Sequence, residues 1–211
     1  MLANQNRKEI SNQNFVPNII ILSAEMGQGH MSAAKAVKEG IEHLHGNAYK
    51  VEIIDFMDFL SARINRVSKK TYERFARSAP AVCNLIFKTW DRKWQMKLLN
   101  RLNYALVAKK LAHFFQEKKP DLIISTFPVW DHLARESLRK YDKKLKFISI
   151  ITDSINIHNA WTLADMDFQI VANPETAQAV KKLGVKSTKV KTLGFPVRLN
   201  FLHPIDKKAF L

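Results

Sequence analysis

The sequence predicts an α/β protein of the Rossmann type, with a mostly parallel sheet and helices on both faces. Short apolar segments alternate with helical segments along most of the chain. These apolar segments are too hydrophobic for strands with one solvated face, and strands buried on both faces belong to parallel sheets that helices cover. A glycine-containing turn also follows the first apolar segment, where this fold binds ligands.

The first part of the alternation contains three expected strands and one helix. Residues 18–23 (NIIILS) form a continuous apolar run, which predicts the first strand. A helix is expected at residues 31–44, whose first turns are rich in serine and alanine, and a second strand at 51–54. Pro120 introduces the third strand, at residues 121–125 (DLIIS).

The second half repeats the alternation. A helix is expected at residues 131–140, and strands at 147–151 and 168–171. Pro174 then begins a helix that reaches about residue 183, because proline favours the first helical position. A weaker sixth strand is expected at 188–193.

The composition describes a globular protein that favours an anionic partner. The 211 residues suit one domain, and 34 Lys and Arg against 19 Asp and Glu give a formal charge of +15. Such a charge favours nucleic acid, a membrane surface or phosphorylated ligands. The single cysteine, Cys83, excludes an intrachain disulfide and fits a reducing compartment. Residues 1–17 are polar, are expected to be flexible and hold no secretory signal, and the longest apolar stretch, near 19–24, is too short to span a bilayer.

Most of the positive charge lies in the middle of the chain. Residues 61–119 hold fifteen Lys and Arg against three acids, a net of +12. Apolar residues recur there at helical spacing, and tryptophans stand four residues apart. This pattern indicates a basic helical insert at about 57–119 that touches a membrane, although a helix that packs on the core with a solvated basic face has the same periodicity. The expected membrane-contact residues are Arg63, Arg66, Lys70, Arg74, Trp90, Arg92, Lys93 and Trp94.

The turn after the first strand contains two glycines, and a histidine directly follows the second one. Its sequence is Met26-Gly27-Gln28-Gly29-His30. It is neither a dinucleotide fingerprint, since position 32 is serine, nor a P-loop, since no Gly-Lys-Ser/Thr follows. An imidazole at the carboxyl edge of the sheet suits a general base at neutral pH, and the alternative is a histidine that caps the helix.

Two further loops are expected at the same edge. Residues 125–130 follow the third strand, and residues 152–161 follow the fourth. The fold would gather Asp153, His158 and Trp161 near the turn histidine. Asp153 either orients an imidazole or caps the next helix, and His158 either binds a polar head group or lies on the surface. A metal site has no compact ligand spacing in its favour.

Four motifs in order resemble one enzyme family. They are G-Q-G-H at 27–30, I-S-T-F-P at 124–128, T-D-S-x₃-H-x₂-W at 152–161 and G-F-P-V at 194–197. Together they are similar to the monogalactosyldiacylglycerol synthase and processive diacylglycerol glucosyltransferase family, from about residue 18 to residue 201.

The resemblance implies the amino-terminal lobe of a GT-B glycosyltransferase over residues 18–203, with an interlobe linker beginning at 204–211. Such an enzyme moves a hexose from a UDP-sugar to diacylglycerol with inversion, as a peripheral protein on the cytoplasmic face of an anionic membrane, without a metal or cofactor. The donor-binding lobe would belong to the same longer chain or to a partner chain. In this resemblance His30 is the base, and the acceptor or anionic-lipid residues are Gly27, Gly29, Pro128, Asp153, His158 and Trp161.

Two rival functions stay open at this point. A module that keeps the fold but lacks the donor lobe would bind a membrane surface without catalysis. A nucleic-acid binder is suggested by charge alone, because no RNA-binding aromatic motif or helix-turn-helix is present. We therefore expect no nucleic-acid partner.

Overall fold

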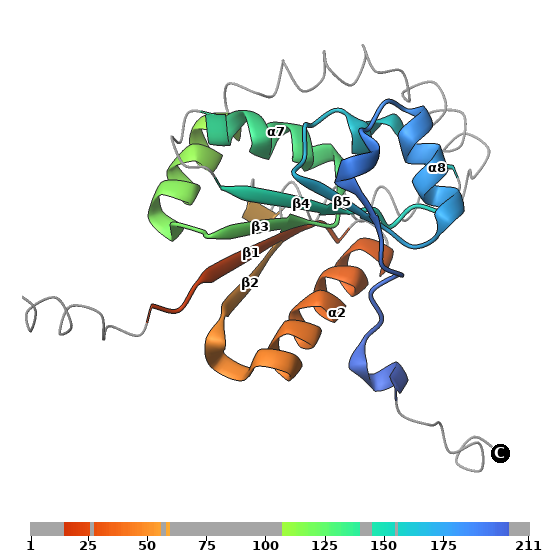
Figure 1. Cartoon of the computed structure of the whole chain (residues 1–211). Coiled ribbons are helices and arrows are strands. Elements are labelled where there is room, and N and C mark those ends of the chain that lie inside the picture. The colour runs from red at the N-terminus through yellow and green to blue at the C-terminus, as the bar shows by residue number, and fades with distance from the viewer. Residues whose placement is uncertain are drawn as a thin grey trace, which may run out of the picture.

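A computed structural model of the chain contains one parallel sheet of six strands (Figure 1). The strand order is β2-β1-β3-β4-β5-β6. The structure describes residues 15–25, 28–55, 58–59, 107–139, 145–154 and 156–202. The strands are β1 (Asn18–Ser23), β2 (Lys50–Asp55), β3 (Leu122–Ser125), β4 (Lys146–Ile150), β5 (Phe168–Val171) and β6 (Val190–Thr192).

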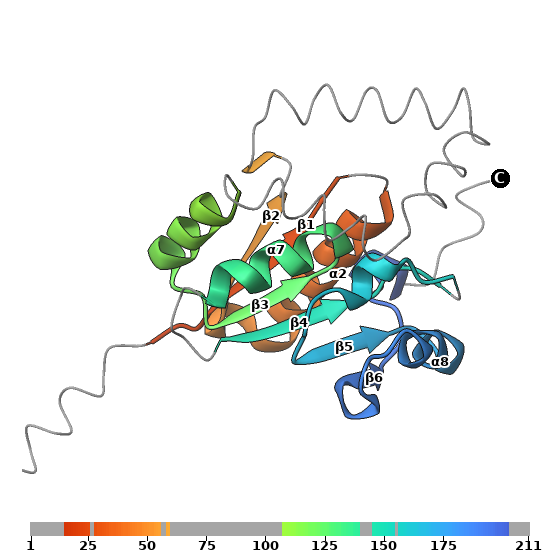
Figure 2. The same cartoon turned by 90° about the horizontal axis from the view of Figure 1, so that it is seen from above.

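Helices cover both faces of this sheet. In Figure 1, α2 (Gln28–His45) lies on one face, and α7 (Pro128–Arg139) and α8 (Pro174–Lys182) lie on the other. The view from above in Figure 2 shows α7 running over β3 and β4. The expected Rossmann-like fold class, a parallel sheet with helices on both faces, is therefore confirmed.

The two faces are built from alternate residues of β1. Ile19 and Ile21 pack with Ala34 of α2, whereas Ile20 and Leu22 pack with the aromatic cluster under α7. Every one of these residues is buried. A strand with two buried faces has no polar alternation, which is why the apolar run predicted it.

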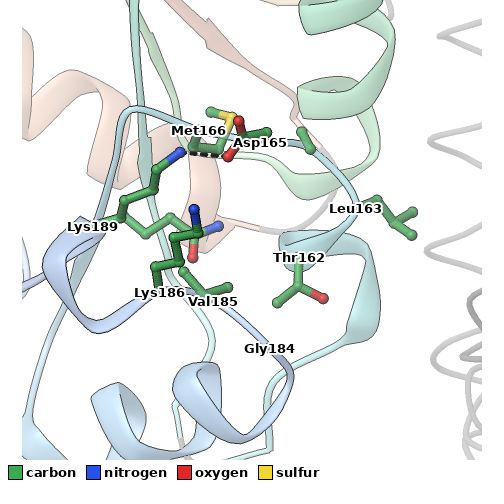
Figure 3. A pocket seen from close by; sticks show the side chains of 10 residues that line it. Thr162, Leu163, Asp165, Met166, Gly184, Val185, Lys186 and Lys189 are labelled. Carbon is green, nitrogen blue, oxygen red and sulfur yellow. Dashed lines mark hydrogen bonds and ion pairs between the residues drawn. The ribbon is translucent and has the colours of Figure 1, made fainter.

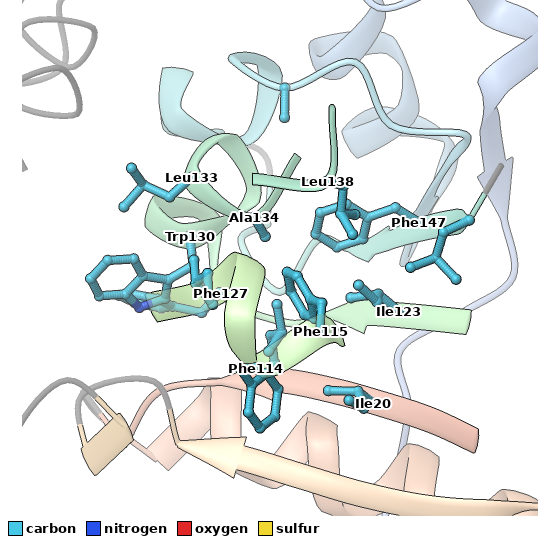
Figure 4. Packing of buried hydrophobic residues seen from close by; sticks show 14 of the residues in the cluster. Ile20, Phe114, Phe115, Ile123, Phe127, Trp130, Leu133, Ala134, Leu138 and Phe147 are labelled. Carbon is cyan, nitrogen blue, oxygen red and sulfur yellow. The ribbon is translucent and has the colours of Figure 1, made fainter. Parts of the chain in front are cut away.

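A further helical segment at residues 107–118 completes the second face. Leu111 and Phe115 are buried in the cluster around Phe127 and Phe147 (Figure 4). Lys119, which follows the segment, has a left-handed φ of 46°, a conformation that ends helices. This end of the expected basic insert thus packs on the core, and the eight residues expected to contact a membrane lie outside the described residues.

The order in which the chain adds strands to the sheet reverses between β1 and β3, while all strands stay parallel. From β1 the chain returns through α2 to β2 on one side, and from β3 it continues through α7 to β4 on the other. The carboxyl ends of β1 and β3 lie side by side, with Leu22 paired to Ser125. Ligands of open α/β sheets bind in the crevice at such a point, so this edge is where a site is expected.

Candidate functional site

His30 lies at this switch point, in the first turn of α2. Its Nδ1 is 2.8 Å from the carbonyl oxygen of Thr126 and 2.7 Å from Oγ1 of Thr152. Thr126 directly follows β3, and Thr152 follows β4 by two residues. The imidazole therefore joins the carboxyl ends of three adjacent strands. It does not cap its own helix.

The contact with Thr126 fixes which nitrogen carries the proton of the neutral ring. A carbonyl oxygen only accepts hydrogen bonds, so Nδ1 is the protonated nitrogen that donates to it. Nε2 then holds the lone pair. An imidazole held in this tautomer is oriented to accept a proton from a ligand at Nε2.

The surroundings of His30 favour its neutral form. Burial lowers the pKa of the imidazole below its usual value, while the hydrogen bond to Thr126 and the negative charge of Asp153 oppose this effect. The ring is thus largely uncharged at neutral pH, as a general base must be.

Two aromatic side chains bracket the imidazole. The Phe127 ring meets it edge-on, with centroids 5.0 Å apart and planes at 79°. The Trp161 ring lies 6.3 Å away at 46° and is fully buried. These contacts restrict rotation of the imidazole and supply the low-polarity surroundings that lower its pKa.

Asp153 organises the loop after β4. Its Oδ2 accepts from Nε1 of Trp161 at 2.9 Å and, more weakly, from the backbone N–H of His158 at 3.4 Å. His158 caps the short helix η3 (Asn159–Thr162), since its Nδ1 accepts from the Ala160 N–H at 3.1 Å. Asp153 therefore orients the indole directly and acts on His30 through its charge.

The remaining acceptor residues of the sequence analysis differ in accessibility. Gly29 is exposed, and a Cβ built on it would meet no atom within 4 Å, so a ligand can approach the backbone there. Pro128 is buried as the first residue of α7. Gly27 lies outside the described residues.

Two contributing residues were not among the expected site residues. Thr126 and Thr152 lie within hydrogen-bond distance of Nδ1 of His30. Their position in the sequence could have indicated them, because each follows the end of β3 or β4 by one or two residues.

Two further findings concern the described residues. No group of three His, Cys, Asp or Glu side chains among them is placed to hold a metal ion. None of the helices they form is long and apolar enough to cross a membrane.

The fold matches that expected for the amino-terminal lobe of a GT-B glycosyltransferase, and comparison with known proteins gives the family. The family model for monogalactosyldiacylglycerol (MGDG) synthase matches residues 30–197. The chain belongs to this family.

Similar proteins include enzymes from plants and bacteria. The chain is 26% identical over 207 residues to monogalactosyldiacylglycerol synthase 1, chloroplastic, of Arabidopsis thaliana, which covers 92% of this chain and 36% of the relative. It is 26% identical over 196 residues to the processive diacylglycerol beta-glucosyltransferase of Bacillus cytotoxicus, which covers 88% of this chain and 46% of the relative. The chain thus spans less than half the length of these relatives.

A solved structure shares the fold. The lipopolysaccharide outer core galactosyltransferase WaaB, in its apo form, aligns with a TM-score of 0.55 and 14% sequence identity. The alignment covers 86% of this chain and 46% of that one.

Proposed function

We propose that this chain is the acceptor-binding lobe of an inverting glycosyltransferase that moves a hexose from a UDP-sugar to diacylglycerol. The observation that carries the proposal is the geometry of His30, whose Nδ1 donates to the Thr126 carbonyl and leaves Nε2 as the basic nitrogen. The choice of acceptor is supported by the names of similar proteins, a monogalactosyldiacylglycerol synthase and a diacylglycerol beta-glucosyltransferase.

In the proposed reaction, Nε2 of His30 takes the proton of the acceptor hydroxyl. The hydroxyl oxygen attacks the anomeric carbon, and the bond between that carbon and UDP breaks with its electron pair leaving on UDP. One displacement inverts the anomeric configuration. A neutral hydroxyl is a poor nucleophile, so a positioned base that is uncharged at neutral pH accelerates this step.

We place the UDP-sugar on a second lobe, in the same longer chain or in a partner chain. Backbone donors and helix dipoles of that lobe would stabilise the departing diphosphate, so the reaction is expected to need no metal or organic cofactor. Residues 204–211 would begin the connection between the lobes.

The base assignment is tested by His30→Ala in the active enzyme that contains this chain. We expect kcat/KM to fall by about 10² to 10⁴-fold, the usual contribution of a general base, while binding to liposomes is unchanged. His43→Ala is the matched control, because His43 is exposed in the last turn of the same helix. Transfer at near wild-type rate in the His30 variant would disprove the assignment.

We further propose that the lobe is peripheral and binds the anionic cytoplasmic face of a membrane. The support is the net +12 of residues 61–119, since each Lys or Arg near an anionic surface contributes about 1 kcal/mol. Replacing Arg63, Arg66, Lys70 and Arg74 by Gln should weaken sedimentation with anionic liposomes, as should added salt. Equal binding to neutral liposomes at any salt concentration would contradict this electrostatic account.

A further inference from the structure

A buried carboxyl group is bonded to the strand end that leads into the turn beside His30. Asp131, in the first turn of α7, is fully buried, and its Oδ2 accepts from Oγ of Ser149 at 2.8 Å. Its carboxyl group also forms a hydrogen bond with the hydroxyl of Ser125. The two serines are register partners near the carboxyl ends of β3 and β4, and both are fully buried. Asp131 therefore ties these strands together directly before the loops that reach His30.

Ser125 connects this carboxyl group to the peptide unit that His30 contacts. The N–H of Phe127 donates to Oγ of Ser125 at 3.3 Å, and that hydroxyl donates to the Phe127 carbonyl at 3.1 Å. The N–H of Phe127 and the carbonyl of Thr126 belong to one planar peptide unit. That Thr126 carbonyl accepts from Nδ1 of His30 at 2.8 Å. The serine hydroxyl therefore holds one end of the peptide unit, and the imidazole holds the other.

The proton on Asp131 decides which way the Ser125 hydroxyl points. Serine has one hydroxyl hydrogen, and the Phe127 carbonyl only accepts. A neutral carboxyl group can donate to Oγ of Ser125 and leave the serine hydrogen for this carbonyl, whereas a carboxylate would draw that hydrogen away from the turn. The surroundings favour the neutral form. Oδ1 of Asp131 has no hydrogen-bond partner among the described residues, and burial raises the pKa of Asp131 to about 7.

From this series of contacts we infer that Asp131 is a positioning residue for His30, whose neutral carboxyl group fixes the peptide unit that sets the imidazole tautomer. The same turn also carries the Phe127 ring, which meets the imidazole with centroids 5.0 Å apart. The inference rests on the proposed function, because the tautomer matters for transfer only if Nε2 of His30 is the base. An acidic residue that merely stabilises the start of a helix would affect stability and leave the imidazole unchanged.

The first test is nuclear magnetic resonance of the His30 ring nitrogens in this chain, without substrate. Asp131→Ala removes both hydrogen bonds of the carboxyl group. We expect the fraction of the tautomer protonated at Nε2 to rise about fivefold, as the loss of one hydrogen bond predicts. Asp131→Asn should keep the wild-type tautomer, because an amide can accept from Ser149 and donate to Ser125.

Two control variants separate this effect from a general loss of packing or of charge. Ser137→Ala removes an equally buried hydroxyl from the same helix, where Oγ donates to the Leu133 carbonyl at 2.7 Å. Asp165→Ala removes a carboxylate that pairs with Lys189 beside a pocket at the amino ends of β5 and β6, the opposite edge of the sheet (Figure 3). Neither change should alter the His30 tautomer.

The second test is the rate of the active enzyme that contains this chain. Asp131→Ala should lower kcat by about 10- to 100-fold with little change in KM, because a misplaced base slows the reaction without weakening acceptor binding. Asp131→Asn should keep kcat near the wild-type value. If the Ala variant does not fold, Ser149→Ala removes one of the two hydrogen bonds and should shift the tautomer in the same direction.

The two tests distinguish this inference from the base assignment. A wild-type tautomer in the Asp131→Ala chain, or an Asn variant that behaves like the Ala variant, would overturn the inference at any transfer rate. A shifted tautomer supports the positioning by Asp131. If the His30→Ala enzyme nevertheless transfers sugar at full rate, the proposed base is wrong and the positioning of the imidazole stands.

Discussion

At the scale of single residues, the carboxyl group of Asp131 is the most unusual feature of the core. It is fully buried in the first turn of α7, and its Oδ1 has no hydrogen-bond partner in the described structure. Burial raises the pKa of Asp131 to about 7, although the hydroxyls of Ser125 and Ser149 lower it in part. At neutral pH a large fraction of this carboxyl group is therefore protonated.

This raised pKa links stability to pH. The unfolded chain loses the Asp131 proton near pH 4, and the folded chain keeps it up to about pH 7. The folded state therefore binds more protons across this window, and its stability decreases as pH rises from about 4 to 7, by at most about 1.4 kcal/mol per pH unit from this group.

Asp131→Asn removes this titration. We expect the variant to gain stability relative to the wild type as pH rises from 4 to 8, measured by urea unfolding at several pH values. Ser137→Ala is the control, because Ser137 is equally buried on α7 but does not titrate. A constant difference between the Asn variant and the wild type at all pH values would contradict the prediction.

The site residues show how much of the candidate site could be predicted from the sequence. Topology predicted that Asp153, His158 and Trp161 gather near His30, because parallel strands end at one edge. The hydrogen bonds themselves were not predictable. Whether Nδ1 of His30 meets Asp153 or the Thr126 carbonyl depends on loop positions that a residue pattern does not contain.

At the scale of elements, the predicted ends of helices and strands differ from the structure more than their central residues do. The strand at residues 18–23 and the one at 168–171 match the prediction, whereas the helix expected at 131–140 begins three residues earlier, at Pro128. Proline fits the first helical position because it needs no N–H there. The prediction assigned residues 125–130 to a loop after the third strand, so it placed this first turn outside the helix.

The helical segment at 107–118 provides a test of core packing. Leu111 is 1% exposed in the aromatic cluster. Leu111→Ala should lower the free energy of unfolding by roughly 2–5 kcal/mol, as expected for a buried leucine that leaves a cavity. Lys109→Ala on the exposed side of the same segment should change it by less than about 0.5 kcal/mol. Similar effects of the two changes in urea unfolding would show that this segment does not pack on the core.

At the scale of the whole molecule, the sheet joins two parts that are each local in sequence. β1 and β2 pair within residues 18–55, and β3 to β6 pair in chain order within residues 122–192. The pairing of β1 with β3 must bring together the ends of residues 56–121. Closing a longer loop costs more conformational entropy, and contacts that are distant in sequence form slowly.

We therefore expect β4 and β5 to gain amide protection before β1 and β3 pair during refolding. Pulsed hydrogen exchange measures this order, with the Thr126 amide, which donates to the Leu22 carbonyl across the junction at 3.0 Å, as the reporter of closure. Protection of Thr126 at the same rate as the amides of β4 and β5 would contradict this order.

The position of His30 on this junction has a consequence for the life of the protein in the cell. Its ring belongs to the first part of the chain, and both of its hydrogen-bond partners belong to the second. A newly made chain can therefore hold most of its secondary structure before the imidazole has a fixed tautomer. The proposed base would then be in place only when folding is complete, and a chain that stops earlier would lack it.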